Sequence, residues 1–378
     1  MVFVDCAPFG APRRPVKALE GFKNLTWRTH CFASRPTRPL RLAMDRARQK
    51  LARAMFDVGG AASEGALSTR AFGLERVLRE ASADVYLGHN IETLLPLWRA
   101  AWWRTALVMF DSMEFHSDMG DSQTPVERGV TRAIEKDFLP QCALVLASSD
   151  QVAEALAQQY CIPRPLALYN VPPVEEQIPQ KPQNGLALYW RNAVVGLGQR
   201  GLDEALVALE KLPGDVTLHL QGRLPADGGA VLRTRIMELG LGNRVVFHEP
   251  YAPEDAVKEA ARHHVGLCLE RKGNRNHDLT VSNKIFDYHM AGLAVIASDL
   301  PGLSSVVARS GGGLLFEPGS AQDLKQKILA LYHDRAGLNT LAAKARDFAL
   351  REGNRDVEMK KFCTAFANVC RTRLGVTI

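Results

Sequence analysis

Residues 282–287 could bind a ligand that is anionic at one end and hydroxylated at the other. The stretch SNKIFDYHMAG places Ser282, Asn283 and Lys284 at the predicted start of a helix, with Asp287 three residues after the lysine. A lysine and free backbone N–H groups at a helix start favour a phosphate. A carboxylate one turn further on can accept hydrogen bonds from ribose hydroxyls. The pattern therefore predicts a nucleotide-sugar site, with a simple surface ion pair between Lys284 and Asp287 as the alternative.

The helix that would carry these residues has recognisable ends in the sequence. Ser282 is a good N-cap residue, the helical pattern runs to about Ala291, and Gly292 would end it. A lysine in the first turn is slightly unfavourable against the helix dipole unless an anion lies nearby. A bound phosphate would supply that anion.

The glycine-rich stretch GLGQRG, Gly196–Gly201, is a second candidate. It satisfies the G-x-G-x-x-G dinucleotide fingerprint. That fingerprint opens directly from a strand, whereas six residues separate Leu197 from Trp190, the last residue of the predicted strand. Asp215, where a ribose acid is wanted, lies in a turn ahead of the next predicted strand. A loop that presents Arg200 to a phosphate and a surface loop with an incidental arginine are the other interpretations.

Short β-like runs alternate with helical patterns along the chain, as in βαβ units with parallel sheets. The predicted strands are VFVD, TWRTHCF, ADVYLG, TALVMFD, LVLASS, GLALYW, VTLHLQG, RVVFHE, HVGLCLE and LAVIAS. A stretch rich in Pro, Gln and Asn separates the two sets. We expect domains at 1–168 and 186–350, a linker at 169–185 and a C-terminal helix at 351–378. The fold class is α/β, with two doubly wound, Rossmann-like domains facing each other across a cleft.

Composition predicts a globular protein of more than one domain. A chain of 378 residues exceeds the size at which one hydrophobic core keeps growing. No apolar run approaches the roughly 20 residues of a membrane span, and the first residues do not resemble a signal peptide, so we expect a cytoplasmic protein. The seven cysteines include no Cys-x-x-Cys pair, which argues against a disulfide framework and a structural zinc site.

The net charge of +6 is concentrated near the N-terminus, where residues 1–58 hold 12 Lys/Arg against 4 Asp/Glu. The stretch PLRLAMDRARQKLARAMF predicts a basic amphipathic helix that either lies on an anionic membrane or packs on its own domain. LWRAAWWR, with Trp98, Trp102, Trp103 and Arg104, leaves the same two interpretations open. Nucleic acid is not expected as a partner, because the rest of the chain is not basic and holds no recognised reader motif.

Several stretches resemble the donor-binding region of the group 1 glycosyltransferases: SNKIFDYHMAGLAVIASDLPGLSSVV, GGGLLFEPGSAQDL, and the segment from LALYW to VTLHLQGRLP. The likeness is strongest from about residue 186 to 320 and fainter in ADVYLGHNIETLLPLW and LVMFDSMEFHSDM. It implies a GT-B fold whose C-terminal domain holds most of a nucleotide-sugar donor and whose final helix crosses back to the N-terminal domain. It also implies retention of anomeric configuration, without an essential metal and without a cofactor besides the donor itself.

The resemblance assigns a donor site. Arg200 matches the basic residue of the first donor-domain loop, which contacts the diphosphate, and Asp287 stands where the family usually has a ribose-binding glutamate. Asn283 and Lys284 match the Asn-Lys pair of polysaccharide-assembly relatives. The implied donor-binding residues are Arg200, Gly201, Ser282, Asn283, Lys284 and Asp287.

The family's second acidic residue is missing from this sequence. It is expected eight positions before Asp287, which is Leu279 here; Asp278 or Glu270 could compensate.

The N-terminal FDSMEFH resembles the relatives' Tyr-Asp-x-His-Glu, with Met113 in place of the histidine. If that histidine binds the donor sugar, this chain must use another group, so Glu114 and His116 are the candidate catalytic residues. His263, His264 and His289 are assigned no role, because such residues are more often packed or exposed than ligating.

The predicted function is transfer of a sugar, of the hexosyltransferase type, from a nucleotide diphosphate sugar to an acceptor hydroxyl in polysaccharide or glycoconjugate assembly. The expected partners are the donor, a glycan or lipid-linked acceptor, and the inner face of a membrane. A nucleotide-sugar epimerase and a non-catalytic sugar-nucleotide-binding subunit are the alternatives; the departures at Met113 and Leu279 are what the second would predict.

Overall fold

The computed structural model of the chain describes residues 1–8, 26–179, 181–182, 184–198 and 200–376. The backbone forms two compact units: unit 1 comprises Met1–Ala167 and Ala365–Ile378, and unit 2 comprises Leu168–Thr364. Helix α15, Arg355–Leu374, therefore has residues in both units. The predicted linker differs from the structure, because Tyr169 and Val171 belong to the core of unit 2. Linker residues 180 and 183, the N-terminal stretch 9–25, and 377–378 of the predicted C-terminal helix lie outside the described residues.

Unit 2 contains a six-stranded parallel sheet in the order β9-β8-β7-β10-β11-β12. Numbered along the chain, this order is 3-2-1-4-5-6, that of a doubly wound dinucleotide-binding domain. The predicted strands are confirmed, although β7 extends four residues beyond Trp190. The strands are β7 (Leu186–Val194), β8 (Val216–Arg223), β9 (Val245–His248), β10 (Val265–Cys268), β11 (Ala294–Ser298) and β12 (Gly313–Phe316).

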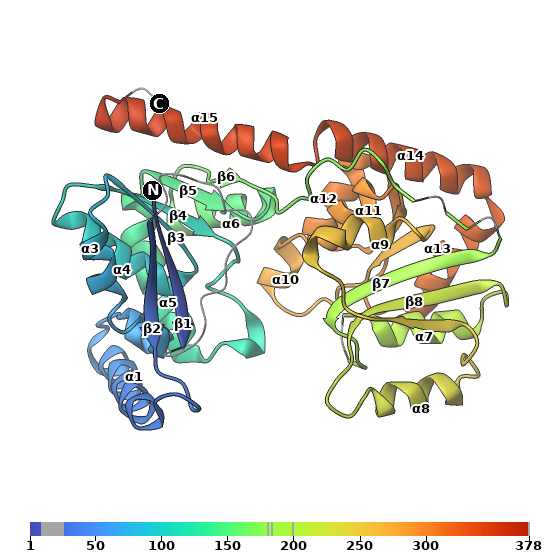
Figure 1. The fold of residues 1–378 in the computed structure, drawn as a ribbon, viewed down its shortest axis with the longest axis horizontal. Helices are drawn as coiled ribbons and strands as arrows, with labels where there is room; N and C mark the ends of the chain where they lie inside the picture. The colour runs from blue at the N-terminus through green and yellow to red at the C-terminus, as the bar shows by residue number, and fades with distance from the viewer. Residues whose placement is uncertain (9–25, 180, 183, 199, 377–378) are drawn as a thin grey trace. The chain divides into compact units, whose positions relative to one another are not determined.

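Helices cover both faces of this sheet, with α7 and α8 on one side and α9 and α11 on the other (Figure 1). Successive side chains of a strand point to opposite faces, so Leu188 and Trp190 enter one core and Tyr189 enters the other. The helices of unit 2 are α7 (Leu202–Glu210), α8 (Ala230–Glu238), α9 (Ala256–Ala260), α10 (Arg275–Leu279), α11 (Lys284–Met290), α12 (Pro301–Ser310), α13 (Ala321–His333) and α14 (Arg335–Arg351).

Unit 1 contains a four-stranded parallel sheet in the order β3-β4-β5-β6. The strands β1 and β2 form a separate parallel pair, and the two-residue β6 was not predicted. The strands are β1 (Val2–Pro8), β2 (Thr26–Phe32), β3 (Val85–His89), β4 (Leu107–Ser112), β5 (Leu144–Ala147) and β6 (Leu166–Ala167).

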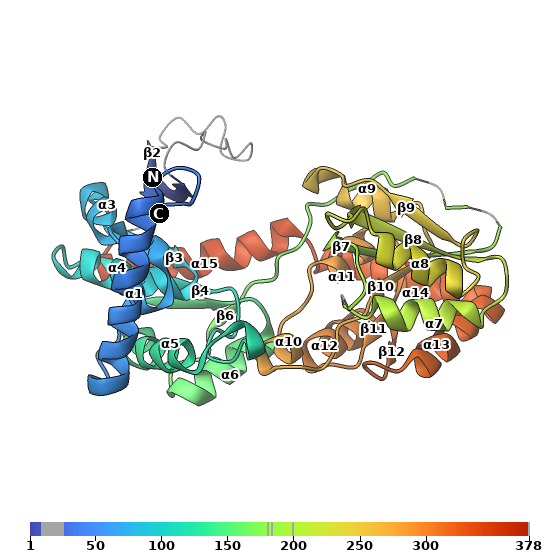
Figure 2. The ribbon, with the colours of Figure 1, turned by 90° about the horizontal axis from the view of Figure 1, so that it is seen from below.

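The helices of unit 1 connect and flank these strands, with the long α1 running past α4 and α5 (Figure 2). They are α1 (Pro39–Gly59), α2 (Glu64–Leu67), α3 (Leu74–Ala81), α4 (Ile91–Trp102), α5 (Pro125–Phe138) and α6 (Asp150–Tyr160). Within the described residues, no helix combines the length and the apolar character that crossing a membrane requires.

Candidate functional site

The strand order of unit 2 locates a ligand site. The connections from β7 and β10 leave these neighbouring strands in opposite directions, and open α/β sheets bind ligands outside the carboxyl ends of the strands at such a point. A pocket of about 510 Å³ lies there. We call it the unit 2 pocket; it is lined by Arg191, Asn192, Ala193, Arg200, Gln221, Gly222, Arg223, Pro250, Tyr251, Pro253, Ser282, Asn283 and Lys284.

The wall formed by β7 and β8 depends on a glycine. The register of the two strands shifts between Arg191 and Val194, which brings the carbonyl of Asn192 against Gly222. A Cβ on Gly222 would lie 1.9 Å from that oxygen, and its φ of +146° is one that other residues rarely adopt. Gly222 therefore permits the close backbone approach that shapes the pocket.

The loop between β7 and α7 holds Arg200 at the pocket. The indole Nε1–H of the buried Trp190 donates to the carbonyl of Arg200 over 3.2 Å. Gly201 follows with a φ of +70°, and a Cβ there would lie 2.7 Å from the carbonyl oxygen of Leu269. Gly201 thus acts through backbone shape and is not among the lining residues; Gln199 lies outside the described residues.

One sequence argument against the dinucleotide interpretation was wrong. Because β7 runs to Val194, only Val195 and Gly196 separate the strand from Leu197, so the glycine-rich stretch does lie between a strand and a helix. The argument from Asp215 gains support. Asp215 lies at the amino end of β8, where its carboxylate accepts from the hydroxyl of Tyr332 over 2.8 Å, at the opposite end of the strand from the pocket.

A buried carboxylate joins the two phosphate-binding candidates. Glu270, just after β10, accepts from Arg200 over 2.7 Å and lies 3.3 Å from the ammonium of Lys284. Burial alone would raise the pKa of Glu270, but Lys284 and Arg200 together lower it. Glu270 therefore remains ionised and holds both cations in place. The sequence indicated Glu270 only as one of two possible replacements for the missing acid.

Lys284 is buried, with 7% of its surface exposed, yet lines the pocket. The prediction that Ser282 caps its helix was wrong: Asn283 precedes Lys284 with helical backbone angles, and no side chain of the described residues caps the helix. The reason is a turn bond from the N–H of Ile285 to the carbonyl of Ser282, which starts the helical winding earlier. Ser282 and Asn283 line the pocket with Lys284.

Asp287 lies behind the pocket instead of lining it. Its carboxylate accepts from the guanidinium of Arg191, which does line the pocket and also donates to the hydroxyl of Tyr251. Both charged side chains are mostly buried, at 18% and 14% exposure. A carboxylate has about four acceptor positions, so Asp287 retains capacity for a ligand hydroxyl.

Unit 1 brings a second set of polar groups together at the carboxyl ends of β3 and β4. The Nδ1 of His89 lies 2.8 Å from Asp111, its registered partner on the next strand. This hydrogen bond raises the pKa of His89, although burial opposes the rise. A histidine–carboxylate pair of this kind can transfer protons near neutral pH.

The two predicted catalytic residues follow β4. Glu114 is half-buried, and its carbonyl accepts from the hydroxyl of Ser112 over 2.9 Å. His116 is buried against Phe110, and burial lowers its pKa to about 4. Met113, the departure from the family pattern, is 46% exposed beside them.

Sequence reasoning missed Arg191, Tyr251, His89 and Asp111. A signal was present for three of them, since Arg191, His89 and Asp111 are polar residues at the ends of apolar strand runs, and parallel sheets place their ligand sites at those ends. Tyr251 follows β9 inside a proline-flanked loop and carried no such signal.

The family of glycosyl transferases group 1 matches residues 194–334. The structure is similar to HepE from Anabaena in complex with UDP, with a TM-score of 0.70 at 16% identity over 97% of this chain and 99% of that one. It is similar to sucrose-phosphate synthase from Thermosynechococcus elongatus, with a TM-score of 0.65 at 17% identity over 81% and 78%. It is also similar to the lipopolysaccharide outer core galactosyltransferase WaaB, with a TM-score of 0.61 at 14% identity over 91% of this chain and 84% of that one. No curated protein sequence matches the chain.

The structural similarities, at such low identity, show the fold of the whole chain. The sequence match supplies the class of enzyme, and it spans Arg200, Glu270 and helix α11. The chain therefore has a GT-B fold, and within it residues 194–334 match the group 1 glycosyltransferases.

Proposed function

We propose that the unit 2 pocket binds a nucleoside diphosphate sugar and that the protein transfers the sugar to an acceptor hydroxyl in polysaccharide or glycoconjugate assembly. The observation that carries the proposal is the convergence of Arg200 and Lys284 on the pocket, with Glu270 holding both. The volume falls within the range of about 300 to 1,000 Å³ of small-molecule sites.

The chemistry follows from where charge develops. As the anomeric C–O bond to the diphosphate breaks, negative charge grows on the leaving group, and donors fixed in advance stabilise it. Arg200 and Lys284 would be those donors, and each hydrogen bond from them to the leaving group would contribute about 1.5 to 3 kcal/mol. Two fixed cations at the leaving group support the proposal that no metal is essential, and the match to the group 1 family supports the proposal of retention of configuration. Ser282 and Asn283 would contact the phosphates. Asp287 does not line the pocket, so its proposed part in donor binding is to hold Arg191, which does.

Glu114 is the proposed catalytic residue of unit 1, orienting the donor sugar or assisting the acceptor proton. The buried ring of His116 favours a positioning role in the loop after β4. His89 and Asp111 are further acceptor-side candidates, because the pair lies at the same edge of the sheet.

A nucleoside diphosphate is expected to raise the melting temperature of the purified protein. A ligand that binds only the folded state adds about 2.7 kcal/mol of stability at 100 times its dissociation constant. The measurement is a thermal melt with UDP, GDP, their sugar conjugates and NAD. Stabilisation by NAD alone would contradict the proposal and restore the dinucleotide interpretation of GLGQRG.

Turnover separates the remaining alternatives. An epimerase would convert the stabilising nucleotide sugar without an acceptor, and a non-catalytic subunit would neither convert nor transfer it.

Helix α1 supports a peripheral membrane contact, which would bring the protein to a lipid-linked acceptor. Its apolar stripe does not pack on unit 1, because all of its residues are exposed. The stripe consists of Leu40, Met44, Ala47, Leu51 and Met55. The opposite side faces the unit, where Arg53 donates to the carbonyl of Ala66 over 2.9 Å and pairs with Glu127. Exposed basic residues flank the stripe, namely Arg41, Arg46, Arg48 and Lys50. An apolar stripe between cations suits an anionic lipid surface.

The double variant Leu51→Glu/Met55→Glu is expected to lose binding to vesicles that contain anionic phosphatidylglycerol. Carboxylates would replace apolar contacts and be repelled by the lipid. Vesicle flotation measures the binding. The matched control is Val231→Glu/Met237→Glu, which changes two similarly exposed residues on α8 of unit 2. If the wild type and both double variants bind the anionic vesicles equally, or if the wild type binds neutral vesicles as well as anionic ones, α1 is not the contact.

A further inference from the structure

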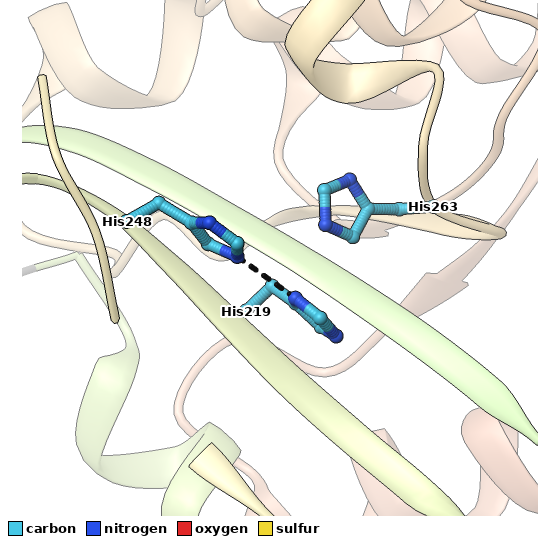
Figure 3. Close-up of side chains that lie close together, drawn as sticks. All are labelled: His219, His248 and His263. Carbon is cyan, nitrogen blue, oxygen red and sulfur yellow. Dashed lines mark hydrogen bonds between the residues drawn. The ribbon is translucent and has the colours of Figure 1, made fainter. Parts of the chain in front are cut away.

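Three histidines from separate elements of unit 2 form a cluster apart from the unit 2 pocket. His219 is on β8, His248 ends β9, and His263 follows α9. One ring nitrogen of each lies within 4.8 Å of those of the other two. In Figure 3 the ring of His263 faces the hydrogen-bonded pair of His219 and His248.

The sheet explains why the rings meet. Leu218 and Leu220 enter the core on the α7 and α8 side, so His219 points to the other face, which α9 covers. On the neighbouring strand, His248 is in register with Gln221, which shares that face. His219 and His263 lie edge to face, with ring centres 4.5 Å apart.

Hydrogen bonds orient the nitrogens of the cluster. Nδ1 of His263 lies 3.1 Å from the carbonyl of Ala260, and because a carbonyl only accepts, Nδ1 carries the proton and Nε2 holds the lone pair. Nε2 of His219 bonds to the hydroxyl of Thr217 over 3.1 Å. If that nitrogen donates, Nδ1 of His219 also presents a lone pair, towards Nε2 of His248 at 2.9 Å. Partners of this kind hold metal-ligating histidines in place.

We propose that His219, His248 and His263 bind a divalent transition-metal ion, Zn²⁺ being the best-suited occupant, through Nδ1 of His219 and Nε2 of the other two. Tetrahedral Zn²⁺ lies about 2.0 to 2.1 Å from imidazole nitrogens, which places ligand nitrogens about 3.4 Å apart. The 2.9 Å pair must open slightly and His263 must approach, movements within reach of side-chain rotation. His219 and His248 are only partly buried, so water can enter and take the fourth position.

The protons balance without an added reactant. In the metal-free cluster, Nε2 of His248 donates to Nδ1 of His219; on binding, that proton moves to Nδ1 of His248 and Nε2 becomes a ligand. Burial lowers the pKa of His219 to about 4 and that of His263 to about 3, so both rings are neutral near pH 7. The neutral ring is the form that binds metals.

The ion would brace the wall of the unit 2 pocket. His263 stacks on Tyr189 with ring centres 4.4 Å apart, and the hydroxyl of Tyr189 donates over 2.7 Å to Gln221, which lines the pocket. Gln221 also donates to the carbonyl of Glu249, directly after His248. The ion would thereby tie β8, β9 and the end of α9 together, whether or not the pocket binds a nucleotide sugar.

The test is metal binding to the purified full chain, treated with chelator and carrying no polyhistidine tag. Titration calorimetry with Zn²⁺ is expected to show one ion per chain, and Co²⁺ to give the visible absorption of a tetrahedral site. His248→Gln and His263→Gln should each weaken Zn²⁺ at least about tenfold, since even outer partners of metal ligands cost 10- to 100-fold. The control His333→Gln removes an exposed histidine outside the cluster and should bind as the unchanged protein does.

The proposal would be overturned if His248→Gln bound Zn²⁺ as tightly as the unchanged protein does. It would also be overturned if His333→Gln lost as much Zn²⁺ affinity as His248→Gln. His248 is partly exposed on the edge strand β9, so this variant answers the question even if His263→Gln does not fold. UDP binding, measured in parallel, keeps the two proposals separate: a protein that binds UDP but not Zn²⁺ retains the proposed donor site and loses only this one.

Discussion

Lys284→Met is expected to weaken UDP binding by about 10- to 100-fold, because a hydrogen bond from a charged donor contributes about 1.5 to 3 kcal/mol and each 1.4 kcal/mol is a factor of ten. Methionine fills nearly the same volume, so the buried position gains no cavity. Calorimetric titration with UDP measures the change. The control is Lys327→Met, which removes one positive charge from the partly exposed surface of α13 in the same unit.

Part of this loss would come from Glu270, because once Lys284 is gone the partner that its carboxylate keeps within the described part of the chain is Arg200. The double variant Lys284→Met/Glu270→Gln separates the two causes. Partial recovery of affinity is expected, because the repulsion between Glu270 and phosphate disappears while the lysine's hydrogen bond stays lost. Wild-type affinity in Lys284→Met itself would mean that the diphosphate lies away from α11.

The elements that hold this site were predictable because local patterns determine them. The strands of unit 2 are apolar runs bounded by turn residues, and their βα alternation permits few topologies other than a parallel, doubly wound sheet. Arg200 lies in the loop between β7 and α7, and Lys284 is the first residue of α11, so their place at the carboxyl edge of the sheet follows from sequence position.

The interactions between these elements were not predictable. Glu270 meets both cations only because β10 lies beside β7, a neighbour distant in sequence. The predicted end of β7 at Trp190 was wrong because polar Arg191 and Asn192 continue the strand through an irregular register. The stripe of α1 had the periodicity of a packed face, and periodicity does not reveal which face is covered.

The cluster of His219, His248 and His263 shows the same limit. The three histidines lie on β8, at the end of β9 and after α9, and no spacing in the sequence joins them. The argument from cysteine spacing addressed zinc sites built on Cys-x-x-Cys, and it had no bearing on ligands that only the pairing of β8 with β9 and the end of α9 bring together.

Arg191→Met is expected to lower the free energy of unfolding of unit 2 by about 3 to 5 kcal/mol, the usual cost of leaving a buried charge without its partner. Asp287 is 14% exposed and pairs with Arg191. Hydrogen exchange followed by mass spectrometry over β7 and α11 measures the loss within this unit. The double variant Arg191→Met/Asp287→Leu should recover most of it, because replacing both charges by apolar groups removes the unpaired carboxylate.

The pH dependence identifies the carboxylate as the cause. Burial raises the pKa of Asp287 and Arg191 opposes that rise, so the variant leaves burial unopposed. A carboxyl whose folded pKa lies above its unfolded value of about 3.9 destabilises the protein at high pH and ceases to do so once it is protonated. The loss in Arg191→Met should therefore be complete above the raised pKa and shrink as the pH falls through it towards the unfolded value of about 3.9. A loss that is independent of pH would point to the missing contacts of Arg191 with Tyr251 and Tyr288 instead.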